Sequence, residues 1–221
     1  MKRTFSLMFT TTRTQAGFSL LEIAIVLFVL ALLAGTILVP LSAQMEQRYY
    51  DDTTRTMNDV RDALLGFAVV NKRLPCPDTD ADGLENVTGS ACTSAQGNLP
   101  WATLGIGATD AWNQPLLYRV TLAFANPSAT ITLASNPDIR ICQSAGCATA
   151  PNVVAVIVSK GKNQGTCTGA CPDEVENSNN DTTFVSRIRS QPGSGNEFDD
   201  VLVWIPATTL FTRMIAANLL P

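Results

Sequence analysis

The chain has 221 residues, of which 46% are hydrophobic and 15% are charged, and its formal net charge at pH 7 is −4. Fifteen basic residues against nineteen acidic ones leave no basic stripe that could neutralise several phosphates, which argues against nucleic acid as a partner. The sequence contains no histidine, so Ser-His-Asp and Cys-His nucleophile pairs and the H-E-x-x-H zinc helix are excluded. The length fits one ordinary domain with an additional apolar segment.

A basic leader and a long apolar stretch open the chain. Residues 1–17 contain Lys2, Arg3 and Arg13 and no acid, and residues 18–41 contain a single charged side chain. About 20 apolar residues in a helix are enough to cross a bilayer, and a basic segment before them is held in the cytoplasm. This pattern predicts a leader at 1–17 and one membrane-spanning helical segment at 18–41, with the following residues on the other side of the membrane.

A secretory signal is the alternative interpretation of the same stretch. Its apolar region has about 7 to 15 residues and ends at an A-x-A-like cleavage site. Residues 41–43 read Leu-Ser-Ala, with a bulky side chain at the first position, and cleavage there would leave Gln44 as the first residue. On this alternative the protein is a signal-anchored or secreted, disulfide-rich calcium-binding or adhesion module that does not polymerise.

The single charge within the apolar stretch is Glu22, and an acid inside a membrane is costly unless it has a partner or a function. Residues 17–22 read Gly-Phe-Ser-Leu-Leu-Glu. This segment, after a basic leader, resembles the processing site of type IV prepilins and type II secretion pseudopilins. The resemblance implies that a prepilin peptidase cuts between Gly17 and Phe18 and that the new amino group is methylated. It also implies that Glu22 compensates this ammonium group on its own or a neighbouring subunit during assembly.

The resemblance further implies a structural subunit, not an enzyme: a minor pilin or pseudopilin of a type IV pilus or a type II secretion pseudopilus. Its expected partners are other pilin or pseudopilin subunits, contacted through the N-terminal helix, the prepilin peptidase and inner-membrane lipid. The expected location is the inner membrane, single-pass, with the head in the periplasm, or the cell surface after pilus assembly. Major pseudopilins more often carry Asp-Pro-Trp-Gly near residue 112. Ala111 and Asn113 depart from that pattern, which favours a minor or atypical subunit.

Residues 42–71 continue the helix beyond the apolar stretch. Apolar or small side chains recur there at helical spacing, at Met45, Tyr49, Thr53, Met57, Val60, Leu64, Phe67 and Ala68. The prolines at 75 and 77 end the helix. The pattern predicts an amphipathic half-helix that packs on a head, with a coiled-coil dimer as the alternative.

Residues 72–221 are predicted to form one globular, β-rich head, because short apolar runs alternate there with turn-forming residues. The fold class is therefore α+β, with a long N-terminal helix packed on a mainly antiparallel β-sheet, as the resemblance to pilins also implies. Strands are expected at 116–124, 129–134, 138–142, 153–159, 184–188 and 201–205, and a helix at 209–219. The continuous apolar run at 153–158 predicts a central strand.

The six cysteines form an even set on the side of the membrane where disulfides persist. Proximity in the sequence favours pairing Cys76 with Cys92, Cys142 with Cys147, and Cys167 with Cys171. The spacing of the last four is also compatible with one tetrahedral zinc ion, since thiolates are the ligands that zinc prefers. Both alternatives remain open from the sequence.

An acidic loop follows the N-terminal helix. Asp78, Asp80 and Asp82 stand at alternate positions before a glycine, which is the opening of a calcium loop. A complete EF-hand loop needs a glutamate at its twelfth position, and this sequence has a glycine there. Glu85 or Asn86 would therefore have to supply further oxygen. The loop predicts a calcium site, with a solvated acidic loop as the alternative.

Two further patterns are weaker. A second acidic set comprises Asp181, Glu197, Asp199 and Asp200. Asp199 and Asp200 would point to opposite faces if they lay on a strand, which argues against acid–base chemistry by the pair. Ser159 and Lys162 have the spacing of a catalytic Ser-Lys pair, but they follow a predicted strand and lack the companion S-D-N and K-T-G motifs. We therefore predict no enzymatic activity.

Overall fold

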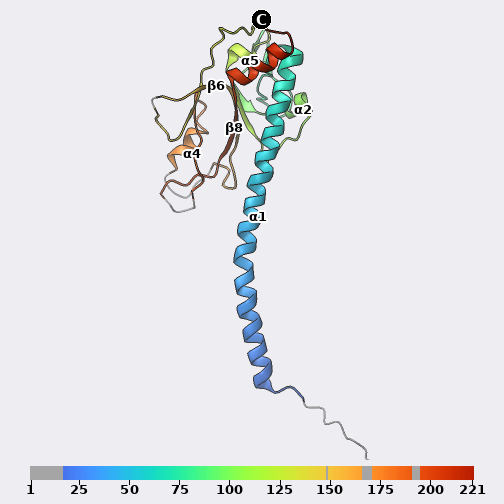
Figure 1. Ribbon diagram of the computed structural model, residues 1–221, viewed down its shortest axis with the longest axis vertical. Coiled ribbons are helices and arrows are strands. Elements are labelled where there is room, and N and C mark those ends of the chain that lie inside the picture. The colour runs from blue at the N-terminus through green and yellow to red at the C-terminus, as the bar shows by residue number, and fades with distance from the viewer. Residues whose placement is uncertain (1–16, 148, 166–170, 191–194) are drawn as a thin grey trace, which may run out of the picture. The chain divides into compact units, whose positions relative to one another are not determined.

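The computed structural model describes residues 17–147, 149–165, 171–190 and 195–221, and at 34–42 it describes the backbone without the side chains. The chain divides into two compact units, Met1–Met45 and Glu46–Pro221, and each is described by itself. The fold is α+β, with an N-terminal helix and a mixed sheet (Figure 1).

The first unit contains the start of helix α1 (Leu20–Asn71). Ser19 precedes the helix and caps it, because the backbone N–H of Glu22 donates to Ser19 Oγ at 3.1 Å. The apolar side chains described between residues 20 and 33 are all exposed. Across the described residues, no helix shows a stretch of the length and apolarity that a bilayer crossing requires. The membrane span predicted at 18–41 includes residues 34–42, whose side chains lie outside the description, and it stays a prediction.

In the second unit, α1 buries one face. Met57, Val60, Leu64 and Ala68 are all buried, at the helical spacing that the sequence indicates. Met45 and Tyr49, which the sequence places on the same face, are 47% and 39% exposed. These side chains share a core with residues of the sheet and of helix α5 (Ala207–Ala216), which lies beside this part of α1 in Figure 1. The face that a coiled coil would use is therefore occupied by the head of the same chain.

The main sheet has the order β3-β4-β6-β5-β7, and β8 pairs with β6. Its strands are β3 (Gln96–Asn98), β4 (Leu117–Val120), β5 (Ile139–Cys142), β6 (Asn152–Ser159), β7 (Thr183–Val185) and β8 (Val201–Pro206). All pairs are antiparallel except β5 with β7, which is parallel, so the sheet is mixed. A separate hairpin joins β1 (Val87–Thr88) to β2 (Ala91–Cys92).

Strand β6 lies at the centre of the sheet, as its apolar run predicts. Residues 155–158 pair with β4 along one edge and with β8 along the other. Val153 pairs with both β5 and β8, so β4 and β5 follow one another along the same edge of β6. Ala155 and Ile157 face the core that contains α1, whereas Val156 and Val158 face a second cluster on the opposite side. Both faces and both edges of β6 are covered.

Short helices and turns replace part of the predicted β structure. The strand expected at 116–124 ends at Val120, and helix α3 (Leu122–Ala125) follows it directly. The strand expected at 129–134 is wrong, because Ser135 Oγ accepts the N–H of Thr132 and closes a turn there. Helix α5 confirms the helix predicted at 209–219. Two further short helices in the described residues are α2 (Trp101–Leu104) and α4 (Pro172–Glu176).

Candidate functional site

The predicted cleavage site lies on an exposed segment immediately before α1. Gly17 and Phe18 are outside the helix and exposed, and Phe18 retains 78% of its accessible surface. A Cβ atom added to Gly17 would meet no other atom within 4 Å. The fold of this chain therefore leaves room for a larger side chain at position 17. The Gly17–Phe18 peptide bond is accessible in the way that a proteolytic site needs.

Glu22 lies in the first turn of α1, on the same short segment as the predicted cut. Its side chain is exposed, and among the described residues it has no hydrogen-bond or ion-pair partner. Its neighbours Leu21 and Ile23 are apolar and exposed. Gly17, Phe18 and Glu22 are therefore all exposed on one short segment, and no described group binds the carboxylate of Glu22.

The acidic loop brings three of its four predicted calcium ligands together. Carboxylate oxygens of Asp78, Asp80 and Asp82 lie within 4.8 Å of one another. Asp78 is buried, and its two oxygens accept the backbone N–H groups of Ala81, at 2.7 Å, and of Gly83, at 2.8 Å. Asp80 and Asp82 are exposed. The loop is therefore closed by backbone hydrogen bonds to Asp78, and calcium binding here stays a prediction.

Glu85 lies apart from these three aspartates and binds Arg73 instead. Its two oxygens accept hydrogen bonds from Arg73 Nη1 and Nη2, each at 2.7 Å, and the backbone N–H of Cys76 adds a third at 3.0 Å. Burial alone would raise the pKa of Glu85, but the hydrogen bonds from Arg73 and Cys76 outweigh it and lower the pKa. Asn86 lies closer to the loop, because its Nδ2 donates to Asp80 Oδ2 at 3.3 Å.

Disulfides join the cysteines that are closest in the sequence. Cys76 pairs with Cys92, and Cys142 pairs with Cys147. Cys171 is also disulfide-bonded, and Cys167, its predicted partner, lies outside the described residues. Sulfurs joined in a disulfide are not thiolates, so the alternative of a zinc ion on the last four cysteines is wrong.

The structure contains a group of three buried carboxylates. The sequence analysis named two of them, Asp199 and Asp200, but not Glu174. Glu174, from α4, lies with Asp199 and Asp200, and carboxylate oxygens of the three are within 4.8 Å of one another. Asp199 and Asp200 precede β8 and do not lie on a strand, so the expectation that strand residues face opposite sides does not apply to them. Burial raises the pKa of Asp199 and of Asp200 to about 7 each. Asp181 lies elsewhere, on an exposed turn.

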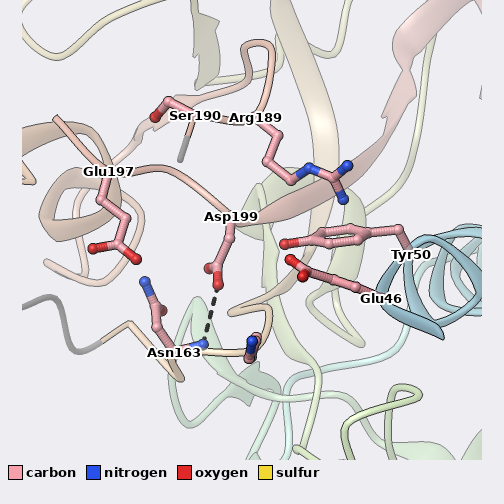
Figure 2. Close-up of a pocket in the computed structure, with 8 residues that line it drawn as sticks. Glu46, Tyr50, Asn163, Arg189, Ser190, Glu197 and Asp199 are labelled. Carbon is pink, nitrogen blue, oxygen red and sulfur yellow. Dashed lines mark hydrogen bonds between the residues drawn. The ribbon is translucent and has the colours of Figure 1, made fainter. Parts of the chain in front are cut away.

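Next to this cluster is a hollow of about 370 Å³, lined by Glu46, Tyr50, Lys162, Asn163, Arg189, Ser190, Glu197 and Asp199 (Figure 2). The Arg189 guanidinium lies over the ring of Tyr50, 4.0 Å from its centroid. Burial, and then the charge of Asp199, raise the pKa of Tyr50. The hollow therefore combines charges of both signs, and Asp199 belongs both to its lining and to the group of three carboxylates.

Ser159 does not pair with Lys162. Its side chain is buried, and its Oγ donates to Asp110 Oδ2 at 2.5 Å while it accepts the N–H of Gly161 at 3.3 Å. Tyr118 is fully buried, and its hydroxyl donates to the carbonyl of Pro75. Both side chains serve the packing of the head.

Residues 12–38 match the family described as the prokaryotic N-terminal methylation motif. This motif is the signature of type IV pilins and pseudopilins, and the chain carries it. The motif implies processing by a prepilin peptidase, assembly with other pilin subunits, and a membrane-anchored or pilus-associated location. Comparisons with curated proteins and with solved structures gave no match.

Proposed function

We propose that this protein is a minor pilin or pseudopilin, a structural subunit of a type IV pilus or a type II secretion pseudopilus. The observation that carries the proposal is the methylation motif at 12–38, with Glu22 on an exposed apolar segment directly after an accessible Gly17–Phe18 bond. Prepilin peptidase removes residues 1–17 and leaves Phe18 as the N-terminal residue. The role is mechanical, and no catalytic step is assigned to the chain.

Assembly in this proposal proceeds through the N-terminal helix. The subunit is held in the inner membrane as a single-pass protein with its head in the periplasm. The exposed apolar side chains after Phe18 are covered first by lipid and then by the helices of other subunits, so that one apolar environment replaces another. Glu22 is the charged group within that surface, and the new ammonium group of a neighbouring or the same subunit neutralises it.

The N-terminal residue of the mature protein tests this proposal. The full chain is expressed with a prepilin peptidase in a bacterial inner membrane, and the purified product is analysed by mass spectrometry. An N-methylated Phe18 is the expected terminus. A protein that begins at Gln44 would instead support the secreted module, and a protein that still begins at Met1 would contradict both processing and assembly.

A glycine variant sharpens this test. Gly17→Asp is expected to abolish cleavage, because the peptidase and not the fold requires a glycine there. Gly107→Asp is the matched control, since Gly107 is also exposed and a Cβ there would meet no atom within 4 Å. The control is expected to be cleaved like the unmodified chain. Cleavage of Gly17→Asp at the same bond would remove the role of Gly17.

A further inference from the structure

Strand β8 forms one end of the main sheet. It pairs with β6 along one edge, and among the described residues no strand pairs with its other edge. In an antiparallel pair, every second residue directs its backbone N–H and C=O away from the partner strand. Within the described ranges, the backbone of residues 201–205 forms no hydrogen bond outside the pairing with β6. The outward groups of β8 are therefore available to another strand.

By contrast, this chain itself covers the two other end strands, β3 and β7. The backbone of Asn98 in β3 exchanges two hydrogen bonds with that of Asp78, at 2.7 and 3.0 Å. On β7, the side chain of Asn177 accepts the N–H of Val185 at 2.6 Å and donates to its carbonyl at 3.0 Å. Proteins cover or charge such edges because a free edge pairs with other chains. The edge of β8 has neither protection among the described residues, since its sequence is VLVWIP.

A hollow of about 310 Å³, the edge hollow, lies beside β8. It is lined by Leu202, Val203 and Trp204 of β8, by Pro206 and Thr209, and by Arg61 of α1. Val203 packs with the core that contains α1, whereas Leu202 and Trp204 pack with the cluster on the opposite face of the sheet. A space that touches side chains of both faces lies at the edge of the strand. α1 lies beside β8 in Figure 1, and Arg61 reaches the edge hollow from that helix.

Arg61 is the one charged side chain in the lining of the edge hollow. Its ion-pair contact among the described residues is with Asp62, at 4.0 Å between Nε and Oδ1, which is too long for a hydrogen bond. The side chain of Arg61 is 37% exposed. A guanidinium can donate two parallel hydrogen bonds to one carboxylate. The edge hollow is therefore complementary to an acidic side chain.

We propose that the outer edge of β8 binds an extended segment of a different protein, which adds a strand to the sheet and places an acidic side chain against Arg61. Backbone hydrogen bonds to β8 provide affinity, and the side chains of the added segment in the edge hollow provide specificity. The β8 strand of a second copy would bring no acid to Arg61, because β8 has no charged residue. This contact uses the head alone, so it is separate from the assembly of N-terminal helices that is proposed above.

Hydrogen exchange of the full chain in detergent tests whether the edge is free. Every second amide of residues 201–205 is expected to exchange slowly, because β6 accepts it, and the amides between them about tenfold faster or more. Mass spectrometry with electron-transfer fragmentation resolves single amides. Residues 155–158 of β6, which pair along both edges, are the control and are expected to be uniformly slow. Uniformly slow exchange along β8 would overturn the proposal, since its outer edge would already be covered.

A photoreactive amino acid in place of Thr209, which lines the edge hollow, identifies the occupant. The full chain is irradiated in its native membrane, and the cross-linked peptides are sequenced by mass spectrometry. We expect an adduct with an acid-containing segment of a different protein, and in that complex the fast amides of β8 should slow by about tenfold or more. Thr208, exposed on the same helix and outside the lining, is the control position. Adducts with a second copy or with lipid alone, or a yield no higher than at Thr208, would contradict the proposal.

Charge reversal tests the role of Arg61. Arg61→Glu is expected to lower the yield of the Thr209 adduct by about tenfold or more, because it sets two acids against each other, whereas Arg61→Lys should retain most of it. Arg55→Glu makes the same change at an arginine of α1 whose side chain is 78% exposed, and is expected to leave the yield unchanged. If circular dichroism shows that Arg61→Glu does not fold, Arg61→Gln takes its place. An unchanged yield in the Arg61 variant, or an equal loss in Arg55→Glu, would refute the pairing of Arg61 with an acid.

Discussion

Both halves of α1 carry apolar side chains, but those described at 20–33 are exposed, whereas the second half buries several of its own in the head. Met57 and Leu64 have no exposed surface, whereas Leu27 and Phe28 in the first half are 60% and 65% exposed. Burial of apolar surface is the main favourable contribution to folding, so the first half gains little from the fold of a single molecule. This difference supports the proposal that the apolar sequence after Phe18 contacts lipid or other subunits.

The largest effect that separates the two halves is expected from Leu64→Ala. Truncating this fully buried side chain leaves a cavity in the core, and the free energy of unfolding is expected to fall by about 2–5 kcal/mol. Leu27→Ala makes the same change on the exposed half and is expected to alter it by less than about 0.5 kcal/mol. Urea unfolding of the full chain in detergent measures both. An equal fall in the free energy of unfolding in the two variants would contradict the difference between the two halves of α1.

Glu22→Val is expected to leave the stability of the head unchanged but to impair assembly. The variant is expected to be cleaved at Gly17 and to stay in the membrane, because the change makes the segment more apolar. Fewer subunits are expected in sheared filaments or in cross-linked oligomers, since no carboxylate compensates the new ammonium group. Asp59→Val, an exposed acid in the second half of α1, is the control. Assembly of Glu22→Val at the normal level would remove the role of Glu22.

A smaller effect is expected where the head closes over the end of α1. Glu85→Gln removes the charge that Arg73 binds, and the free energy of unfolding is expected to fall by about 1–2 kcal/mol at pH 7. The pKa of Glu85 is lowered in the folded state, so its stabilisation is complete above its ordinary pKa of about 4.3 and is lost at lower pH. The gap between variant and unmodified protein should therefore close on acidification. Asp62→Asn, at an exposed acid, should show no such gap.

The smallest effect is expected at the start of α1. Ser19→Ala removes the oxygen that accepts the N–H of Glu22, which destabilises the first turn by about 0.5–1 kcal/mol. Faster hydrogen exchange at the amides of the first turn should follow, while urea unfolding of the head stays unchanged. A shift in the unfolding of the head would show that the two halves of the helix are energetically coupled.

Periodic features of the sequence predicted much of the fold. The burial of Met57 and Leu64 follows from helical spacing, and the central place of β6 follows from its unbroken apolar run. The apolar pattern indicates a strand at 129–134, but the structure has a turn there, in which the Ser135 hydroxyl accepts the N–H of Thr132. Side-chain hydrogen bonds of this kind leave no periodic signal.

The processing motif and the group of three carboxylates also differ in how far the sequence alone could predict them. Gly17, Phe18 and Glu22 are close in the sequence, so a short motif was enough to predict their roles, and residues 12–38 match that motif. Glu174 lies 25 residues before Asp199, and only the folding of α4 against the segment before β8 brings their carboxylates together. Glu85 is close to the acidic loop in the sequence but does not join it in the fold. Both of its carboxylate oxygens accept hydrogen bonds from Arg73 instead.

The coverage of β6 also bears on how this protein avoids aggregation. Its run of five valines and isoleucines around one alanine has the composition of segments that form steric zippers between chains. Because β4, β5 and β8 occupy both of its edges, another molecule finds no free backbone groups there. If the subunits assemble through the N-terminal segment, as proposed, the strand with the strongest tendency to aggregate therefore stays covered inside each head.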